Sequence, residues 1–262
     1  MITSNRHNLI NLGCGLSFHK NWDNYDLYPA DKNVRHIDLL QKLPLDDLSY
    51  DCCYCSHVLE HIQRGYAKGF ISEAYRILKS GGVFRVVVPD LEAIARLYLE
   101  AVNDACSGNE DSIARHQWMT IELLDQLTRS FSGGFMGRLW YSRPLLSRNL
   151  IEERLGNEAT HWLQKFDQDF LNGAKPIIPE HIYDIKTPTP KEESEFRNKG
   201  EIHRWMYDRI SLKELLKQAG FRDVKVCNAT ESMIPNFNSY HLDTDAQGRV
   251  RKPDSLFMEG TK

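Results

Sequence analysis

A glycine-flanked turn near the start of the chain is the first feature that predicts chemistry. Residues 11–15 read Asn-Leu-Gly-Cys-Gly, and the apolar run 9–12 that leads into them predicts a strand. Glycine lets the backbone pass close to a ligand at the carboxyl edge of a parallel sheet, where open α/β folds bind their ligands. A simple tight turn is the alternative, and the residues that follow decide between the two.

Two carboxylates near the ends of the next two predicted strands favour a nucleoside as the ligand. Asp26 belongs to the strand 22–27, and Asp38 belongs to the strand 34–39. A carboxylate at such a place accepts hydrogen bonds from two ribose hydroxyls or from an adenine amino group. Two acids would repel a phosphate, and the second half of the dinucleotide motif G-x-G-x-x-G is missing. The alternative is that each Asp is a solvated turn residue.

An α/β sheet is the frame that brings such strand ends together. Apolar runs and helix-like stretches alternate from residue 8 to residue 88, which favours this fold class. We expect a strand at 50–56 and then a helix at 66–79, closed by Ser80-Gly81-Gly82. The continuous apolar run 83–88 is typical of a strand that is covered on both faces.

The sheet pattern returns near the end of the chain. Ser211 and Glu214 have the spacing of a capping box, and the helix that they start is expected to end at Gly220. Two closing strands are predicted at 221–227 and 255–261.

The middle of the chain lacks this alternation. A helix is expected at 111–131, and residues 187–199 are rich in proline and charge. We therefore divide the chain into a cofactor-binding core at 1–105, a helical insertion or acceptor cap at 106–200, and a C-terminal part of the core sheet at 201–262.

Six stretches share their order and spacing with one known family: 11–15, 24–27, 36–39, 56–62, 73–82 and 87–91. Three C-terminal stretches, 203–208, 211–221 and 252–257, extend the match. Together they resemble the class I S-adenosylmethionine-dependent methyltransferases of the type 11 small-molecule group, and the subgroup associated with surface-polysaccharide biosynthesis. The resemblance implies a Rossmann-like, mostly parallel sheet with an antiparallel last strand, interrupted by a mainly helical inserted lobe.

The resemblance also implies a cofactor, S-adenosylmethionine, with S-adenosylhomocysteine as the product. The residues assigned to the cofactor are Asn11, Gly13, Cys14, Gly15, Asp26, Leu27, Asp38, Leu39, Ser56 and His57. The glycine turn would pass under the methionine part, Asp26 would bind the ribose, and Asp38 would flank the adenine. Many relatives carry an acidic residue in place of Asn11, which leaves open whether the methionine amino group is held directly or through water.

Methyl transfer is a displacement at an activated sulfonium carbon, so catalysis rests on alignment and on removal of the acceptor proton. A base is needed only for a hydroxyl or an ammonium acceptor. We predict His57, Asp90 and His203 as the catalytic residues and keep His61 as a further candidate, because histidine titrates near neutral pH. The structural alternatives are a helix cap for Asp90 and simple packing for the histidines.

Composition excludes several other classes. The 262 residues carry a net charge of -3 and contain no long apolar run, so we expect neither a nucleic-acid partner nor membrane insertion. The polar first residues, 1–8, leave no room for a signal peptide, and we expect a cytoplasmic protein.

No metal site is expected. Cys52, Cys53 and Cys55 would alternate between two faces of a strand, which is unlike a zinc-binding C-x-x-C pair and favours buried thiols. Asp243 and Asp245 imitate the start of a calcium loop, but a hairpin turn between the last two strands is the stronger interpretation.

The leading hypothesis is O-methylation of a sugar or glycan intermediate that is covered by the inserted lobe. A second hypothesis changes the acceptor to another small metabolite or natural product with a hydroxyl or amine. A third is a non-catalytic nucleoside-binding module. The sequence leaves the oligomeric state open.

Overall fold

The computed structural model describes residues 7–262, so the polar start at 1–6 lies outside the described residues. The chain forms two compact units. The sheet unit holds residues 7–90, 205–250 and 255–262, and the helical unit holds residues 91–204 and 251–254. We predicted boundaries after residues 105 and 200. The structure assigns 91–105 to the helical unit because this helix packs along the next one.

Seven strands form the sheet: β1 (Leu9–Leu12), β2 (Asp23–Asp26), β3 (Val34–His36), β4 (Tyr50–Ser56), β5 (Leu78–Pro89), β6 (Arg222–Cys227) and β7 (Ser255–Thr261). Their order is β3-β2-β1-β4-β5-β7-β6. Only β7 runs against its neighbours, and it pairs with both β5 and β6. This confirms the predicted α/β class, a mostly parallel Rossmann-like sheet with an antiparallel last strand.

Two local predictions in the sheet unit are wrong. The helix α1 (Arg64–Ile77) ends before Ser80-Gly81-Gly82, because residues 78–82 extend β5 instead. Leu78 pairs with Tyr50, and Gly81 and Gly82 exchange backbone hydrogen bonds with Lys262. These distant pairings outweigh the local helix-stop pattern.

The second wrong prediction concerns the cap of helix α8 (Arg209–Gln218). The cap is Asp208, whose carboxylate accepts from the backbone N–H groups of Ile210 and Ser211 at 2.9 and 2.8 Å. Ser211 accepts in return from the Asp208 N–H, so Ser211 is the far partner of the capping box rather than its start.

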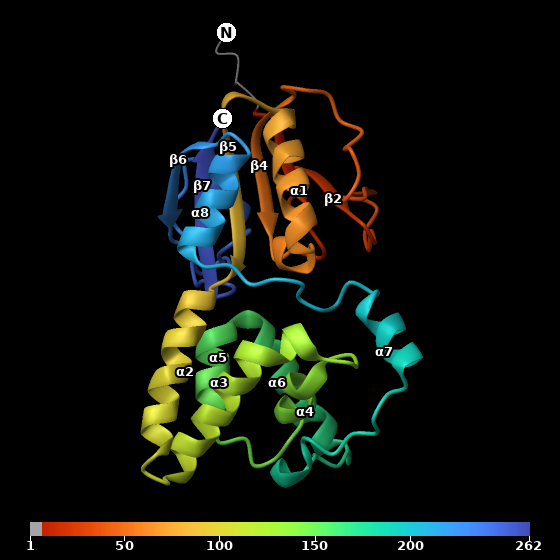
Figure 1. Ribbon diagram of the computed structural model, residues 1–262, viewed down its shortest axis with the longest axis vertical. Coiled ribbons are helices and arrows are strands. Elements are labelled where there is room, and N and C mark those ends of the chain that lie inside the picture. The colour runs from red at the N-terminus through yellow and green to blue at the C-terminus, as the bar shows by residue number, and fades with distance from the viewer. Residues whose placement is uncertain (1–6) are drawn as a thin grey trace. The chain divides into compact units, whose positions relative to one another are not determined.

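The sheet is covered differently on its two faces. Helices α1 and α8 cover one face, as Figure 1 shows, and a large apolar core lies beneath them. On the other face, Ile234, Phe237 and Leu242 pack against strand residues and Trp22. These three residues belong to the irregular segment 228–250, which we call the covering segment.

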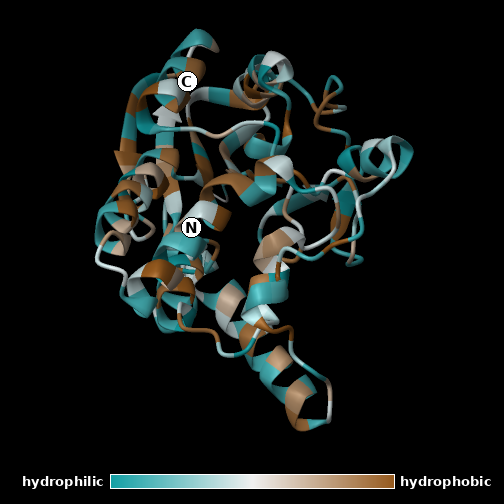
Figure 2. Ribbon diagram, turned by 60° about the horizontal axis from the view of Figure 1, so that its bottom comes forward, coloured by the Kyte–Doolittle hydropathy of each residue, from teal (hydrophilic) through white to brown (hydrophobic). Residues whose placement is uncertain are grey.

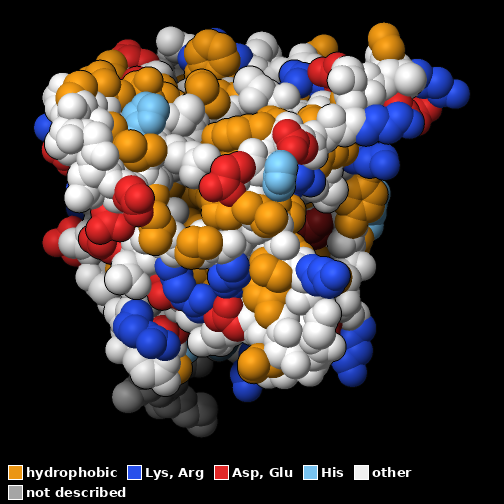
Figure 3. Space-filling view, turned by 90° about the horizontal axis from the view of Figure 1, so that it is seen from below, with side chains coloured by type: hydrophobic (Ala, Val, Ile, Leu, Met, Phe, Trp, Pro, Cys, Tyr) orange, Lys and Arg blue, Asp and Glu red, His pale blue; other side chains and the backbone are white. Residues whose placement is uncertain are grey.

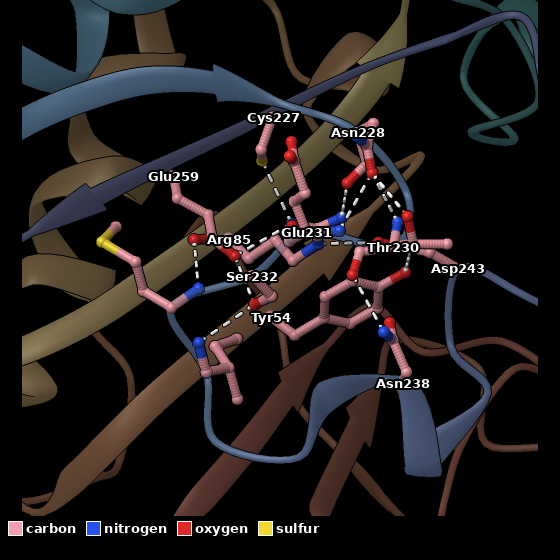
Figure 4. Close-up of polar contacts among 12 residues, drawn as sticks. Tyr54, Arg85, Cys227, Asn228, Thr230, Glu231, Ser232, Asn238, Asp243 and Glu259 are labelled. Atoms are coloured by element: carbon pink, nitrogen blue, oxygen red, sulfur yellow. Dashed lines mark hydrogen bonds and ion pairs between the residues drawn. The ribbon is translucent and has the colours of Figure 1, made fainter.

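A buried cation fastens the covering segment to the sheet (Figure 4). Arg85, in the middle of β5, donates to the Asp243 carboxylate at 2.7 Å and to Glu259 on β7 at 2.9 Å. Its remaining N–H groups donate to the backbone carbonyls of Glu231 and Asn228 at 2.8 and 2.9 Å. The hairpin turn that was predicted at Asp243 and Asp245 is therefore only partly right. Asp245 holds a turn by accepting from residues 247 and 249, whereas Asp243 is a buried ion-pair partner.

The helical unit contains α2 (Leu91–Ala105), α3 (Glu110–Thr128), α4 (Gly134–Trp140), α5 (Arg148–Leu155), α6 (Asn157–Leu171) and α7 (Pro190–Arg197). Figure 2 shows apolar and polar residues alternating along the helices, as expected for amphipathic helices. Trp118 and Trp140 are buried with ring centroids 6.3 Å apart, so they form part of this unit's core.

Charge is mixed on the surface. On the face in Figure 3, acidic, basic and apolar side chains are interspersed. Within residues 7–262, the structure contains no helix that is both long enough and apolar enough to span a membrane.

Candidate functional site

The carboxyl ends of β1, β2 and β4 meet at one edge of the sheet. Asn11 on β1 pairs with Asn24 on β2 and with Tyr54 on β4, and the three strands run in parallel. The residues that follow each strand are therefore neighbours in space. This register brings the glycine turn, Asp26 and Ser56 to the same edge, as the sequence predicted for a ligand site.

The glycine turn has a backbone that only glycine adopts easily. Gly13 and Gly15 have φ angles of 72° and 51°. A Cβ atom on Gly13 would lie 2.3 Å from Cγ2 of Val58, whereas one on Gly15 would meet nothing within 4 Å. Gly13 is thus fixed by packing against the segment after β4, and Gly15 borders open space.

Asp26 links the glycine turn to the end of β2. Its Oδ2 accepts from the Gly15 N–H at 2.8 Å, and its Oδ1 accepts from the Tyr28 N–H at 2.9 Å. Each carboxylate oxygen has a second lone pair, so the two oxygens can also accept from a ligand. The side chain is oriented by the backbone and only half-buried, which suits a ligand contact.

Asn11 and Cys14 lie buried beside this turn. The Asn11 amide donates from Nδ2 to the Ser17 carbonyl at 3.0 Å, and its Oδ1 is buried without a hydrogen-bond partner among residues 7–262. Burial raises the pKa of Cys14 to about 11, so its thiol stays protonated near neutral pH.

Asp38 lies beyond the end of β3, which is shorter than predicted. Its Oδ1 accepts from the Leu40 N–H at 2.9 Å, which makes a local turn. The N–H of Ile37 donates to the Asp26 carbonyl, so the segments after β2 and β3 stay together. Leu39 is half-buried.

Exposed apolar side chains accompany the two acids. Leu27 is 42% exposed, Tyr28 74% and Leu40 58%. Leu27 was assigned to the site from the sequence, whereas Tyr28 and Leu40 were not. Tyr28 and Leu40 each lie two residues after a predicted acid.

His57 stands at the same edge in a left-handed backbone conformation, with φ 53°. Its Nε2 lies 2.9 Å from the Ser255 hydroxyl oxygen, and its Nδ1 lies 3.2 Å from Oε1 of Glu60. The Glu60 side chain is fully buried and that of His57 is 14% exposed. Nε2 is therefore within hydrogen-bond distance of a hydroxyl, and Nδ1 is within ion-pair distance of a carboxylate. Sequence reasoning gave no role to Glu60 or Ser255, although both lie in stretches that carried the resemblance.

The other two predicted catalytic residues belong to other segments of the chain. Asp90 follows β5 and forms a parallel bridge with Tyr207, within the sheet unit. His203 belongs to the helical unit, where its N–H donates to the Gln126 carbonyl at 2.8 Å. A catalytic role for either residue stays a prediction.

Residues 18–86 match the family model Methyltransf_11, described as a methyltransferase domain. The match begins after the glycine turn, ends within β5 and includes Asp26, Asp38 and His57. The chain therefore contains a segment similar to methyltransferase domains, on a Rossmann-like sheet. Its cofactor is S-adenosylmethionine. No curated protein sequence matches the chain.

Several solved structures are similar to this chain at low identity. A possible histamine N-methyltransferase from Thermotoga maritima is 14% identical, with 98% of this chain and 82% of that chain covered and a TM-score of 0.40. A methyltransferase from Mesorhizobium loti is 13% identical, with 98% and 91% covered and a TM-score of 0.37. Likenesses this weak say nothing about the acceptor.

Proposed function

We propose that this methyltransferase transfers a methyl group from S-adenosylmethionine to a hydroxyl of a sugar or glycan intermediate. The observation that supports the choice of cofactor is the position of the Asp26 carboxylate. The N–H groups of Gly15 and Tyr28 orient it at the carboxyl edge of the sheet. In this position it accepts hydrogen bonds from the two ribose hydroxyls.

The surrounding residues fit the rest of the cofactor. Asn11 would offer its buried Oδ1 to the methionine amino group, and Gly15, which borders open space, would leave room for the methionine part. Asp38 would bind the adenine, and the apolar side chains Leu27 and Leu39 would flank the nucleoside.

When bound, S-adenosylmethionine supplies a methyl group on an already activated sulfonium carbon. The residues of this chain then need to align the acceptor and remove its proton. We assign Ser56 to the edge of the cofactor site and His57 to the proton, with Asp90 and His203 as further candidates.

The choice of a sugar acceptor rests on the resemblance to the polysaccharide-biosynthesis subgroup. Its test is a panel of acceptors incubated with S-adenosylmethionine and the full chain, with release of S-adenosylhomocysteine as the readout. One set holds nucleotide sugars, free sugars and glycans, and the other holds small phenols, alcohols and amines. Asp26→Ala is the inactive control.

We expect release with a member of the sugar set and none with the second set. Turnover of the second set alone would show that the acceptor is another small metabolite. Cofactor binding without turnover of either set would favour a nucleoside-binding module and would contradict the proposal.

A further inference from the structure

A carboxylate, an imidazole and a hydroxyl lie in sequence at the carboxyl edge of the sheet. Glu60 Oε1 is 3.2 Å from Nδ1 of His57, and the opposite ring nitrogen, Nε2, is 2.9 Å from the Ser255 hydroxyl. The same order of groups activates a serine hydroxyl in hydrolases, where the imidazole takes the serine proton and the carboxylate stabilises the imidazolium that forms.

Three separate elements hold these groups in place. The His57 N–H donates to the carbonyl of Val87 on β5, which fixes the left-handed turn after β4. Ser255 begins β7 and pairs with Pro89 at the end of β5. Glu60 lies on the short helix Leu59–His61, outside the strands.

The three groups also lie next to the cofactor edge. Val58, the neighbour of His57, is the side chain that packs against Gly13 of the glycine turn. Ser255 and His57 are partly exposed, whereas Glu60 is fully buried. The hydroxyl and the imidazole are therefore the members of the set that an acceptor can reach.

We propose that Ser255, His57 and Glu60 form a proton relay for the acceptor, with Ser255 as the group that touches it. This inference rests on the proposed function. The buried Glu60 carboxylate favours a proton on Nδ1 of His57, because a lone pair there would face a negative charge. Nε2 then has a free lone pair and accepts the Ser255 hydroxyl proton.

In this step the acceptor oxygen exchanges its proton for a methyl group. The acceptor oxygen forms its bond to the methyl carbon while the carbon–sulfur bond breaks and leaves its electron pair on sulfur. Ser255 Oγ takes the acceptor proton as its own proton passes to His57 Nε2. The imidazolium that forms is stabilised by Glu60, which remains ionised.

Asp243 of the covering segment also interacts with His57, but its carboxylate accepts from Arg85 at 2.7 Å. Glu60 is therefore the carboxylate that we expect to stabilise the His57 imidazolium.

The first test reads the tautomer of His57 and needs no acceptor. Long-range ¹H–¹⁵N correlation spectra of the full chain with S-adenosylhomocysteine distinguish Nδ1–H from Nε2–H in the neutral ring, and His57→Gln assigns the signals. The relay predicts the Nδ1–H form. The Nε2–H form would overturn it, because Ser255 could not then pass its proton to the ring.

The second test uses the acceptor found in the panel. Ser255→Ala is expected to lower kcat by about 100-fold, the usual range for loss of general-base assistance, with KM and cofactor affinity unchanged. Ser239→Ala, an exposed serine of the covering segment that hydrogen-bonds only locally, is the matched control and should keep full kcat. A Ser255→Ala variant with the wild-type kcat would contradict the relay.

Glu60→Gln separates proton transfer from simple structure. Since a neutral amide does not stabilise an imidazolium, the acid limb of the kcat–pH profile should move to lower pH. An unmoved limb in a folded variant that binds cofactor would also overturn the relay. If Glu60→Gln fails to fold, the tautomer and the Ser255→Ala result decide. Calorimetry with the wild-type chain keeps the two proposals apart, because absence of cofactor binding would contradict the proposed function rather than the relay alone.

Discussion

Arg85 and Asp243 form an ion pair inside the sheet unit, with Nε 2.7 Å from Oδ2 and both side chains buried (Figure 4). The two residues are far apart in the sequence, on β5 and on the covering segment. A buried guanidinium that loses its partners, or a carboxylate that loses its guanidinium, carries an uncompensated charge. This pair therefore holds the covering segment on the sheet face.

Arg85→Met should lower the free energy of unfolding by about 3–5 kcal/mol, because Asp243 and Glu259 would remain buried without their cation. Adding Asp243→Asn and Glu259→Gln to this variant should restore part of the loss, since it removes the stranded charges. Urea unfolding followed by tryptophan fluorescence measures the free energy of unfolding of both variants. A loss below about 1 kcal/mol for Arg85→Met would show that the pair is dispensable.

The two glycines of the turn should respond differently to alanine. Gly13→Ala places a Cβ 2.3 Å from Val58 in a left-handed backbone, so we expect a loss of about 2–5 kcal/mol in unfolding free energy. Gly15→Ala meets open space and should lose only the backbone term, about 1–2 kcal/mol.

Adding Val58→Ala to Gly13→Ala removes the clash and should recover part of the loss in the same urea titration. Equal losses for the two alanine variants would contradict the packing of Gly13 against Val58.

Much of the sheet could be predicted from the local pattern of apolar and polar residues. Strands β4 and β7 have the predicted bounds, and the three cysteines of β4 are buried as expected. The extension of β5 through Gly81 and Gly82 was missed, because it depends on pairing with Lys262 at the other end of the chain. Local periodicity contains no information about such partners.

The candidate site likewise contains residues that the sequence predicted and residues that it missed. Asp26 was predicted as a ribose-binding residue because its type and its place at a strand end are informative by themselves, and this role stays a prediction. Ser255 and Glu60 were missed as partners of His57, since their significance depends on distances that only the fold creates. Asp243 was interpreted as a turn residue for the same reason, because its partner Arg85 lies on a distant strand.

Glu73 should make the sheet unit sensitive to acid. A hydrogen bond from Arg76 lowers the pKa of Glu73, and the Leu43 N–H adds to this effect. A carboxylate with a lowered pKa in the folded state stabilises the fold above its ordinary pKa of about 4.3, and this stabilisation is lost as pH falls through the folded value.

Glu73→Gln should therefore be less stable than wild type by about 1–2 kcal/mol at pH 7, with a difference that shrinks below about pH 4. Urea titrations at pH 7, 5 and 3.5 measure this. Glu214→Gln, which breaks an exposed pair with Lys217, is the control and should change stability by less than about 0.5 kcal/mol at every pH. A Glu73 difference that stays constant with pH would contradict the assignment.

The most direct test of the account is calorimetric titration of the full chain with S-adenosylhomocysteine. We expect saturable binding to the wild-type chain, and affinity weakened by about 1–3 kcal/mol in Asp26→Ala, because the ribose hydroxyls and two backbone N–H groups lose their acceptor. Asp46→Ala, an exposed aspartate away from the strand ends, should bind as wild type does. Absence of binding to the wild-type chain would contradict the cofactor site, and equal affinity in Asp26→Ala would show that the ribose lies elsewhere.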